Sequence, residues 1–76
     1  MEDMALLTLL LAYREQGINK FLEEMRKTVT DTQNIVPMIR MLINVYNIID
    51  SKKDKGILLD FIQEYLNILK RKNMEE

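Results

Sequence analysis

Hydrophobic residues recur along this chain at intervals of three, four and seven residues, which is the period of an α-helix. Few residues interrupt the pattern, because the 76 residues include one Pro and two Gly. No segment alternates apolar and polar residues over the length of a strand, and no Asn-Gly or Asp-Gly hairpin turn occurs. The sequence therefore predicts an all-α protein, built as a small bundle of three helices.

The first predicted helix spans residues 3–29. Its apolar stripe consists of Met4, Leu7, Leu11, Ile18, Leu22, Met25 and Val29. The stripe passes Gly17 without losing phase, which favours one continuous helix, although a glycine inside a helix costs about 1 kcal/mol relative to alanine. The alternative is a break, with Gly17 as a left-handed residue after a first helix, Ile18 as the apolar contact that follows and Asn19 as the cap of a second helix. The bundle would then have four helices.

Two further helices are predicted over residues 35–50 and 53–72, with residues 73–76 as a frayed tail. Asn34 is a candidate N-cap with Pro37 in the first turn, and Ser51 with Asp54 resembles a capping box. The inward residues of the second helix are expected to be Ile35, Met38, Ile39, Leu42, Val45, Tyr46 and Ile49. Those of the third helix are expected to be Leu58, Leu59, Ile62, Tyr65, Leu66 and Leu69.

A single domain of this size has a marginal core, because a short chain buries only about 60% of the surface that it exposes when unfolded. Small domains commonly add disulfides, a metal or a partner subunit. The sequence contains no Cys and no His, so disulfides and thiolate metal sites are excluded and the commonest metal ligand is missing. We expect no metal and no cofactor, which leaves very good helix packing or oligomerisation.

The helices carry more apolar surface than a three-helix core can bury. Beside the main stripes of the first two helices lie Leu6, Leu9, Leu10, Tyr13, Met41 and Ile48, and beside that of the third lie Ile57, Phe61 and Ile68. Exposed together, these residues would form a larger patch than monomers usually show. We therefore predict a protein interface through the first six, in a homodimer with twofold symmetry that completes the core. The alternative is a bent or four-helix arrangement that buries them all within one chain.

No residue pattern indicates catalysis. The acidic pairs Glu2/Asp3, Glu23/Glu24 and Glu75/Glu76 are sequence neighbours, which do not face each other on a helix. Ser51 is the only Ser and is expected to cap a helix, and a conventional catalytic triad cannot be built without His or Cys. Two isolated glycines do not make a phosphate-binding loop. We expect that the protein is not an enzyme and has no small-molecule substrate.

Basic residues cluster at both ends of the third predicted helix, about 25 Å apart at 1.5 Å per residue. The clusters are Lys52, Lys53 and Lys55, then Lys70, Arg71 and Lys72. Acidic residues flank both clusters, and the net charge is −1 from 11 basic and 12 acidic residues. Nucleic-acid binding, which requires many cations on one face, is therefore the weaker hypothesis.

The leading functional hypothesis is a small interaction or regulatory module that acts as a homodimer and offers a helical face to another protein. The alternatives are a dimeric nucleic-acid-binding regulator that uses the six basic residues, and an adaptor or chaperone-like subunit of a larger assembly. The uncharged run over residues 4–13 is much shorter than the roughly 20 residues of a membrane span. Glu2 and Asp3 precede it, unlike the basic start of a secretory signal. We expect a cytoplasmic protein.

Overall fold

The computed structural model describes the backbone of residues 2–75 and the side chains of residues 4–31 and 33–72. Over this part of the chain the predicted all-α class is confirmed, and no strand is present. The helices are α1 (Glu2–Gln16), α2 (Ile18–Thr28), α3 (Ile35–Ile48) and α4 (Lys52–Glu75), with the short 3-10 helix η1 (Thr32–Asn34) before α3.

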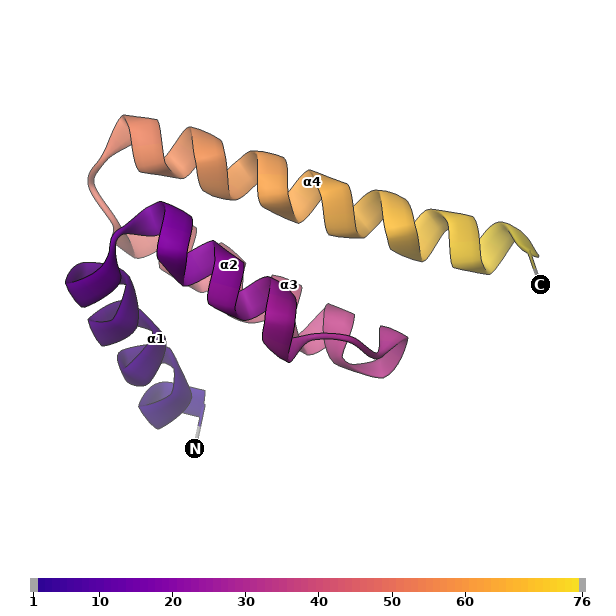
Figure 1. Ribbon diagram of the computed structural model, residues 1–76, viewed down its shortest axis with the longest axis horizontal. Helices are drawn as coiled ribbons and strands as arrows, with labels where there is room; N and C mark the ends of the chain where they lie inside the picture. Colours follow the sequence, from indigo (N-terminus) through magenta and orange to yellow (C-terminus); the bar gives the residue numbers. More distant parts are fainter. Residues whose placement is uncertain (1, 76) are drawn as a thin grey trace.

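The helices form a small bundle in which α1 and α4 each pack against both α2 and α3. In Figure 1, α2, α3 and α4 run along the long axis of the molecule, and α1 is inclined to them below. The last turns of α4 extend beyond the other helices. The molecule measures 39 × 28 × 20 Å along its principal axes.

The helix is interrupted at Gly17, so the predicted continuous helix over residues 3–29 is wrong. Gly17 has φ 83 and ψ 164, a conformation that essentially only glycine adopts. Its N–H still donates to the Tyr13 carbonyl, and its own carbonyl accepts from the Phe21 N–H. Gly17 is therefore the N-cap of α2, the position that the alternative interpretation gave to Asn19. A straight helix of this length would reach about 40 Å, too long for both halves to lie on one small core.

The core consists of side chains from α2, α3 and α4, together with Ile49 after α3. Its buried members are Ile18, Phe21, Leu22, Ile35, Met38, Ile39, Leu42, Val45, Ile49, Leu58, Phe61, Ile62 and Tyr65. Leu42, Val45 and Leu58 are completely buried. The inward residues predicted for α3 are thus confirmed, except that Tyr46 is only half-buried.

Helix α1 presents the opposite side to the core from the one predicted. Met4, Leu7 and Leu11 were expected to point inward, but they are 70%, 51% and 50% exposed. Partly buried residues on the other side of α1 pack against the core instead. The break at Gly17 is the physical reason, because α1 no longer has to continue the phase of Ile18 and Leu22 on α2.

The inward side of α4 also differs from the prediction. Leu59 and Leu66 are 45% and 38% exposed, whereas Phe61, expected beside the main stripe, is buried. Helix α4 packs against both α2 and α3. Packing against α2 buries Phe61 and leaves Leu59 and Leu66 on the outer side of α4.

The helix ends test three of the predictions. The Asp54 N–H donates to Ser51 Oγ over 3.2 Å, so Ser51 caps α4 as expected. Asn34 makes no side-chain cap bond, because its φ −93 and ψ −7 are already helical and a capping residue needs extended backbone. Helix α4 continues to Glu75, so the tail predicted as frayed is helical up to that residue, and residue 76 lies outside the described part.

Candidate protein interface

The six predicted interface residues do not lie on one surface. Four of them, Leu6, Leu9, Leu10 and Tyr13, are partly buried and pack against the protein's own core. Met41 is also half-buried, and Ile48 is 51% exposed on α3. Their role in an interface stays a prediction, but the four α1 residues already contribute to the fold of a single chain.

Tyr13 shows how closely this side of α1 is joined to the bundle. Its hydroxyl donates a hydrogen bond to Asp54 Oδ2 at the start of α4, over 2.5 Å. Its ring meets the Phe21 ring edge-on, with the centroids 6.2 Å apart. The hydrogen bond to Asp54, together with partial burial, raises the pKa of Tyr13 to about 12. Tyr13 therefore connects α1 to both α2 and α4.

The side of α1 that faces solvent carries a line of hydrophobic residues. Met4, Leu7 and Leu11 follow one another at intervals of three and four residues, so they fall on one narrow side of the helix. All three are at least half exposed. We call this line the α1 stripe.

A second exposed hydrophobic surface is formed by α3 and α4 together. On α3, this surface is a row of residues spaced four, three and four apart, namely Val36, Arg40, Ile43 and Asn47. On α4, it is a row of residues spaced three or four apart, namely Lys52, Lys55, Leu59, Gln63, Leu66 and Lys70. Val36, Ile43, Leu59 and Leu66 are 38–50% exposed. We call the two rows together the α3/α4 face.

The contact between Lys55 and Tyr46 joins the start of α4 to the end of α3. Lys55 Nζ lies 5.3 Å from the centre of the Tyr46 ring, and the two helices pack against each other and run antiparallel (Figure 1). Counting one turn along each helix from this contact, we infer that Ile43 lies level with Leu59. Two turns further on, the same counting brings Val36 level with Leu66. The four hydrophobic residues would then form two pairs about 10 Å apart at 1.5 Å per residue.

The opposite side of α4, toward α2, is polar and already occupied by internal contacts. Arg26 forms an ion pair with Glu64, and its guanidinium lies over the rings of Phe61 and Tyr65 at 5.1 and 5.9 Å. Glu64 also raises the pKa of Arg26. A groove of about 330 Å³ runs beside these residues. No local sequence pattern indicates this cluster, because Arg26 and Glu64 are 38 residues apart.

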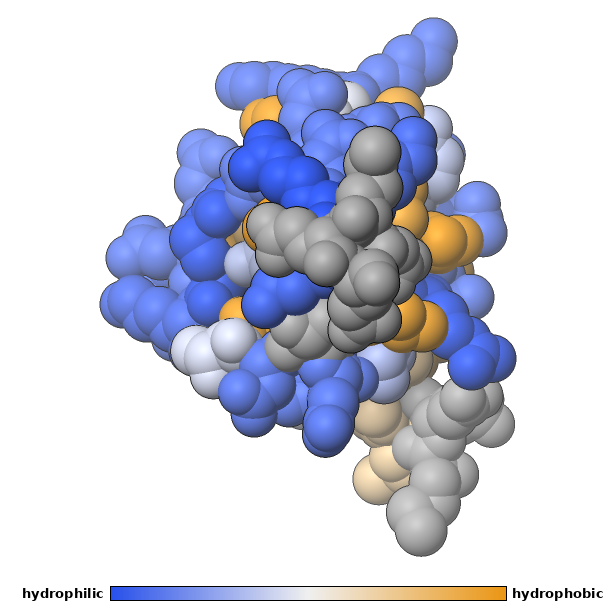
Figure 2. All heavy atoms as spheres, turned by 90° about the vertical axis from the view of Figure 1, so that its right-hand side faces the viewer, coloured by the Kyte–Doolittle hydropathy of each residue, from blue (hydrophilic) through white to orange (hydrophobic). Residues whose placement is uncertain are grey.

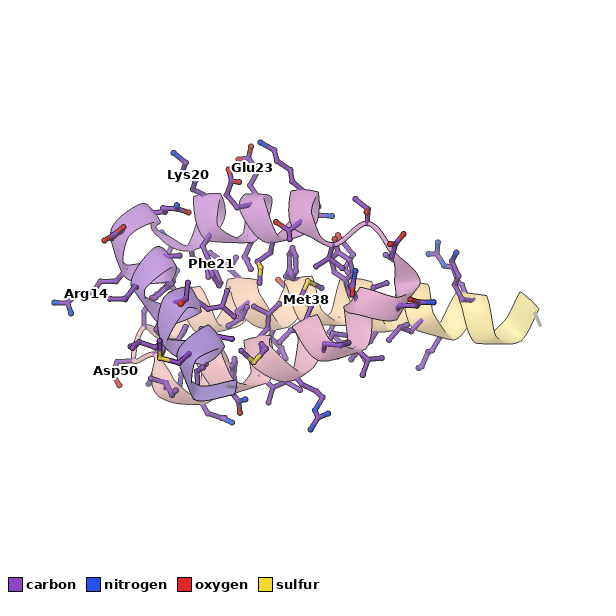
Figure 3. The ribbon with its side chains drawn as sticks, turned by 90° about the horizontal axis from the view of Figure 1, so that it is seen from below. Arg14, Lys20, Phe21, Glu23, Met38 and Asp50 are labelled. Carbon is purple, nitrogen blue, oxygen red and sulfur yellow. The ribbon has the colours of Figure 1, made fainter. Side chains whose placement is uncertain are left out.

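Charged side chains surround the hydrophobic surfaces without covering them. Figure 3 shows Lys20 and Glu23 of α2 projecting outward, whereas Phe21 and Met38 point into the bundle. Figure 2 views the end toward which α4 runs, where exposed hydrophobic residues emerge between hydrophilic ones. At that end of the molecule, the exposed hydrophobic residues are thus interspersed with hydrophilic ones.

The six basic residues of the nucleic-acid hypothesis are divided between different sides of α4. Lys52, Lys55 and Lys70 belong to the α3/α4 face, where they alternate with hydrophobic residues. Lys53, Arg71 and Lys72 fall outside that row, since their positions along the helix turn them elsewhere at roughly 100° per residue. The chain thus does not gather its cations into a continuous basic stripe on α4.

The described residues form neither a metal site nor a membrane span. In that part of the chain, no cluster of three or more potential ligands is placed to hold a metal ion. No helix between residues 2 and 75 combines the length and hydrophobicity needed to cross a bilayer. Comparison with protein-family models, curated proteins and solved structures gave no match.

Proposed function

We propose that this protein is a non-enzymatic helical interaction module that works as a homodimer and is joined through the α1 stripe. The observation that carries the proposal is the exposure of Met4, Leu7 and Leu11, at 70%, 51% and 50%, on the outer side of one helix. Leaving a line of large hydrophobic side chains in water is unfavourable at about 25 cal/mol per Å² of apolar area. A second copy of the same stripe would remove this area from water.

The pattern of the α1 stripe suits a pair of identical helices. Residues spaced three and four apart form the seam along which two helices pack as in a coiled coil. No charged residue occurs between Met4 and Tyr13, so two stripes can meet in the middle without charge repulsion. An antiparallel pair about a twofold axis closes the assembly, because each stripe is then covered by the other.

The dimer proposed here uses the side of α1 opposite to the one predicted from the sequence. The predicted residues Leu6, Leu9 and Leu10 are engaged with the core, whereas the stripe has no such partner in the described chain. The stripe is also short, about 10 Å at 1.5 Å per residue. Small interfaces of this kind give weak, reversible association, so the dimer is expected to depend on protein concentration.

Sedimentation velocity over a wide concentration range tests the proposal. The wild-type chain should shift from monomer to dimer as its concentration rises, and Leu7→Glu should remain monomeric because it places a charge in the centre of the seam. Leu59→Glu is the matched control, since Leu59 is 45% exposed but lies on α4, outside the stripe. Circular dichroism verifies that both variants keep their helices.

Two results would contradict the homodimer. One is a wild-type chain that remains a folded monomer at every concentration. The exposed stripe would then bind a different protein, as in the adaptor hypothesis. The other is a dimer that survives Leu7→Glu but dissociates in Leu59→Glu, which would assign self-association to the α3/α4 face.

A further inference from the structure

We propose that the α3/α4 face is a docking surface for an acidic amphipathic helix of a partner protein. The inference concerns a different surface from the α1 stripe and does not depend on self-association. It rests on the placement of hydrophobic and basic residues along the two neighbouring rows.

The hydrophobic centre of the face has the dimensions of a helix-binding seam. Helix spacing places Ile43 level with Leu59 and Val36 level with Leu66, and two helical turns separate these pairs. A third helix laid along the line between α3 and α4 would contact both pairs with residues at i, i+3 or i+4, and i+7. All four side chains keep 38–50% of their surface exposed, so the seam is open to such a helix.

The charged residues within the two rows have one sign. Each row alternates its hydrophobic residues with cations or neutral amides, and the cations are Arg40, Lys52, Lys55 and Lys70. Neither row contains a carboxylate, although the chain has more acidic than basic residues. Among the described side chains, the ion pairs are those of Arg26 and Lys27 on α2. Arg40, Lys52, Lys55 and Lys70, the basic rim of the seam, thus form no ion pair with a described side chain.

This one-signed rim identifies the kind of occupant. Two copies of the face would bring eight cations together, so the rim disfavours a second copy on this surface. The α1 stripe of a second copy is uncharged between Met4 and Tyr13 and so offers nothing to match the rim. A helix with a hydrophobic stripe flanked by Glu or Asp complements both the seam and the cations. An anionic lipid surface would match the charges too, but the rows contain no aromatic residue of the kind that favours the membrane interface.

Fluorescence anisotropy with two synthetic helical peptides tests the proposal. Both carry leucines at i, i+3 and i+7, with glutamates flanking the stripe in one peptide and lysines in the other. The acidic peptide should bind the wild-type protein and the basic peptide should not. Leu59→Glu and Arg40→Glu should each weaken binding by about tenfold or more, and raising the salt concentration should weaken it further.

Lys20→Glu is the matched control, because Lys20 is an exposed cation on α2 that projects away from the bundle (Figure 3). It makes the same charge reversal outside the face and should leave binding within about twofold of the wild type. Leu7→Glu, which removes the proposed dimer seam, should also bind the acidic peptide normally. This result separates the docking surface from self-association, since either proposal can then fail without the other.

Three outcomes would overturn the proposal. The first is that the acidic peptide does not bind, and the second is that both peptides bind equally. The third is binding to phosphatidylserine vesicles that is lost in Arg40→Glu while the peptide fails to bind, which would assign the face to a lipid surface.

Discussion

Tyr13 makes specific contacts with two other helices. It is partly buried on α1, and its hydroxyl donates to the carboxylate of Asp54 on α4. Asp54 lies in the first turn of α4, where its N–H is held by the cap residue Ser51. The hydroxyl and the cap together fix the position of α1 relative to the start of α4.

The Tyr13 hydrogen bond predicts a loss of stability in alkaline solution. The pKa of Tyr13 is raised from 10.0 to about 12 in the folded protein, so the folded state binds the phenolic proton more tightly than the unfolded state does. The stabilisation is therefore complete below pH 10 and is lost as the pH rises toward 12. Urea denaturation at several pH values should show a larger loss in the wild type than in Tyr13→Phe.

At neutral pH, Tyr13→Phe should lower the free energy of unfolding by about 1–2 kcal/mol, because it removes a hydrogen bond to a carboxylate. Tyr46→Phe provides the control, since it deletes a phenolic hydroxyl at another half-buried tyrosine whose ring contacts Lys55. Equal losses in the two variants would mean that the bond to Asp54 contributes nothing specific.

A buried and an exposed leucine should contribute differently to the free energy of unfolding. Leu42→Ala should cost about 2–5 kcal/mol of unfolding free energy, because Leu42 is completely buried and its loss leaves a cavity. Leu59→Ala should cost less than about 1 kcal/mol, since Leu59 is 45% exposed. Chemical denaturation of both variants gives the comparison, and a large loss in Leu59→Ala would show that this residue is needed for folding.

At the scale of the elements, the break at Gly17 decides how α1 and α2 are used. One residue separates the two helices, and the hydrogen bonds on either side of it are kept. The positive φ of Gly17 turns the chain so that α2 can pack beside α1. Each helix then buries its own side, independently of the other.

The two glycines give opposite predictions for substitution by alanine. Gly17→Ala should destabilise the protein by about 1–3 kcal/mol, because a Cβ is strained at this φ and ψ. Gly56→Ala should stabilise it by about 0.5–1 kcal/mol, since Gly56 lies inside α4 and an added Cβ would meet nothing within 4 Å. Thermal unfolding measures both. An increase in stability for Gly17→Ala would indicate that α1 and α2 can join into one helix.

For the whole molecule, the important feature is that exposed hydrophobic residues occur both on α1 and along the pair α3 and α4. The α1 stripe is uncharged in its middle, whereas the α3/α4 face is bordered by cations. The two areas belong to different helices of the bundle. The arrangement allows one area to join two copies while the other receives a partner.

A crossed set of variants tests this division for the whole molecule. Leu7→Glu should abolish self-association and keep binding of the acidic peptide, and Leu59→Glu should do the reverse. Neither change should alter the helix content, because both residues are about half exposed. Sedimentation velocity and peptide anisotropy on the same preparations give both readouts. Loss of both activities in either variant would mean that the two areas act as one surface.

The sequence by itself determined the helical class and placed the start of α3 at Ile35, where the structure has it. The 3.6-residue period is a local property, and so is the cap at Ser51. The inward side of α3 could also be predicted from its local pattern of apolar residues. The sequence also predicted more apolar helix surface than a three-helix core would bury, but the residues on α1 to which it assigned that surplus pack against the core of the single chain. Other hydrophobic residues are exposed instead.

The tertiary structure alone decided which residues form that exposed surface. Helix α1 is apolar on both sides, so its local pattern fits either orientation, and the choice depends on Gly17 and on the contacts of Tyr13 with α2 and α4. The same holds for Phe61 and Leu59 on α4, where the position of α2 selects the buried member. Periodicity identifies the apolar sides of a helix, but only the neighbouring helices determine which of them faces water.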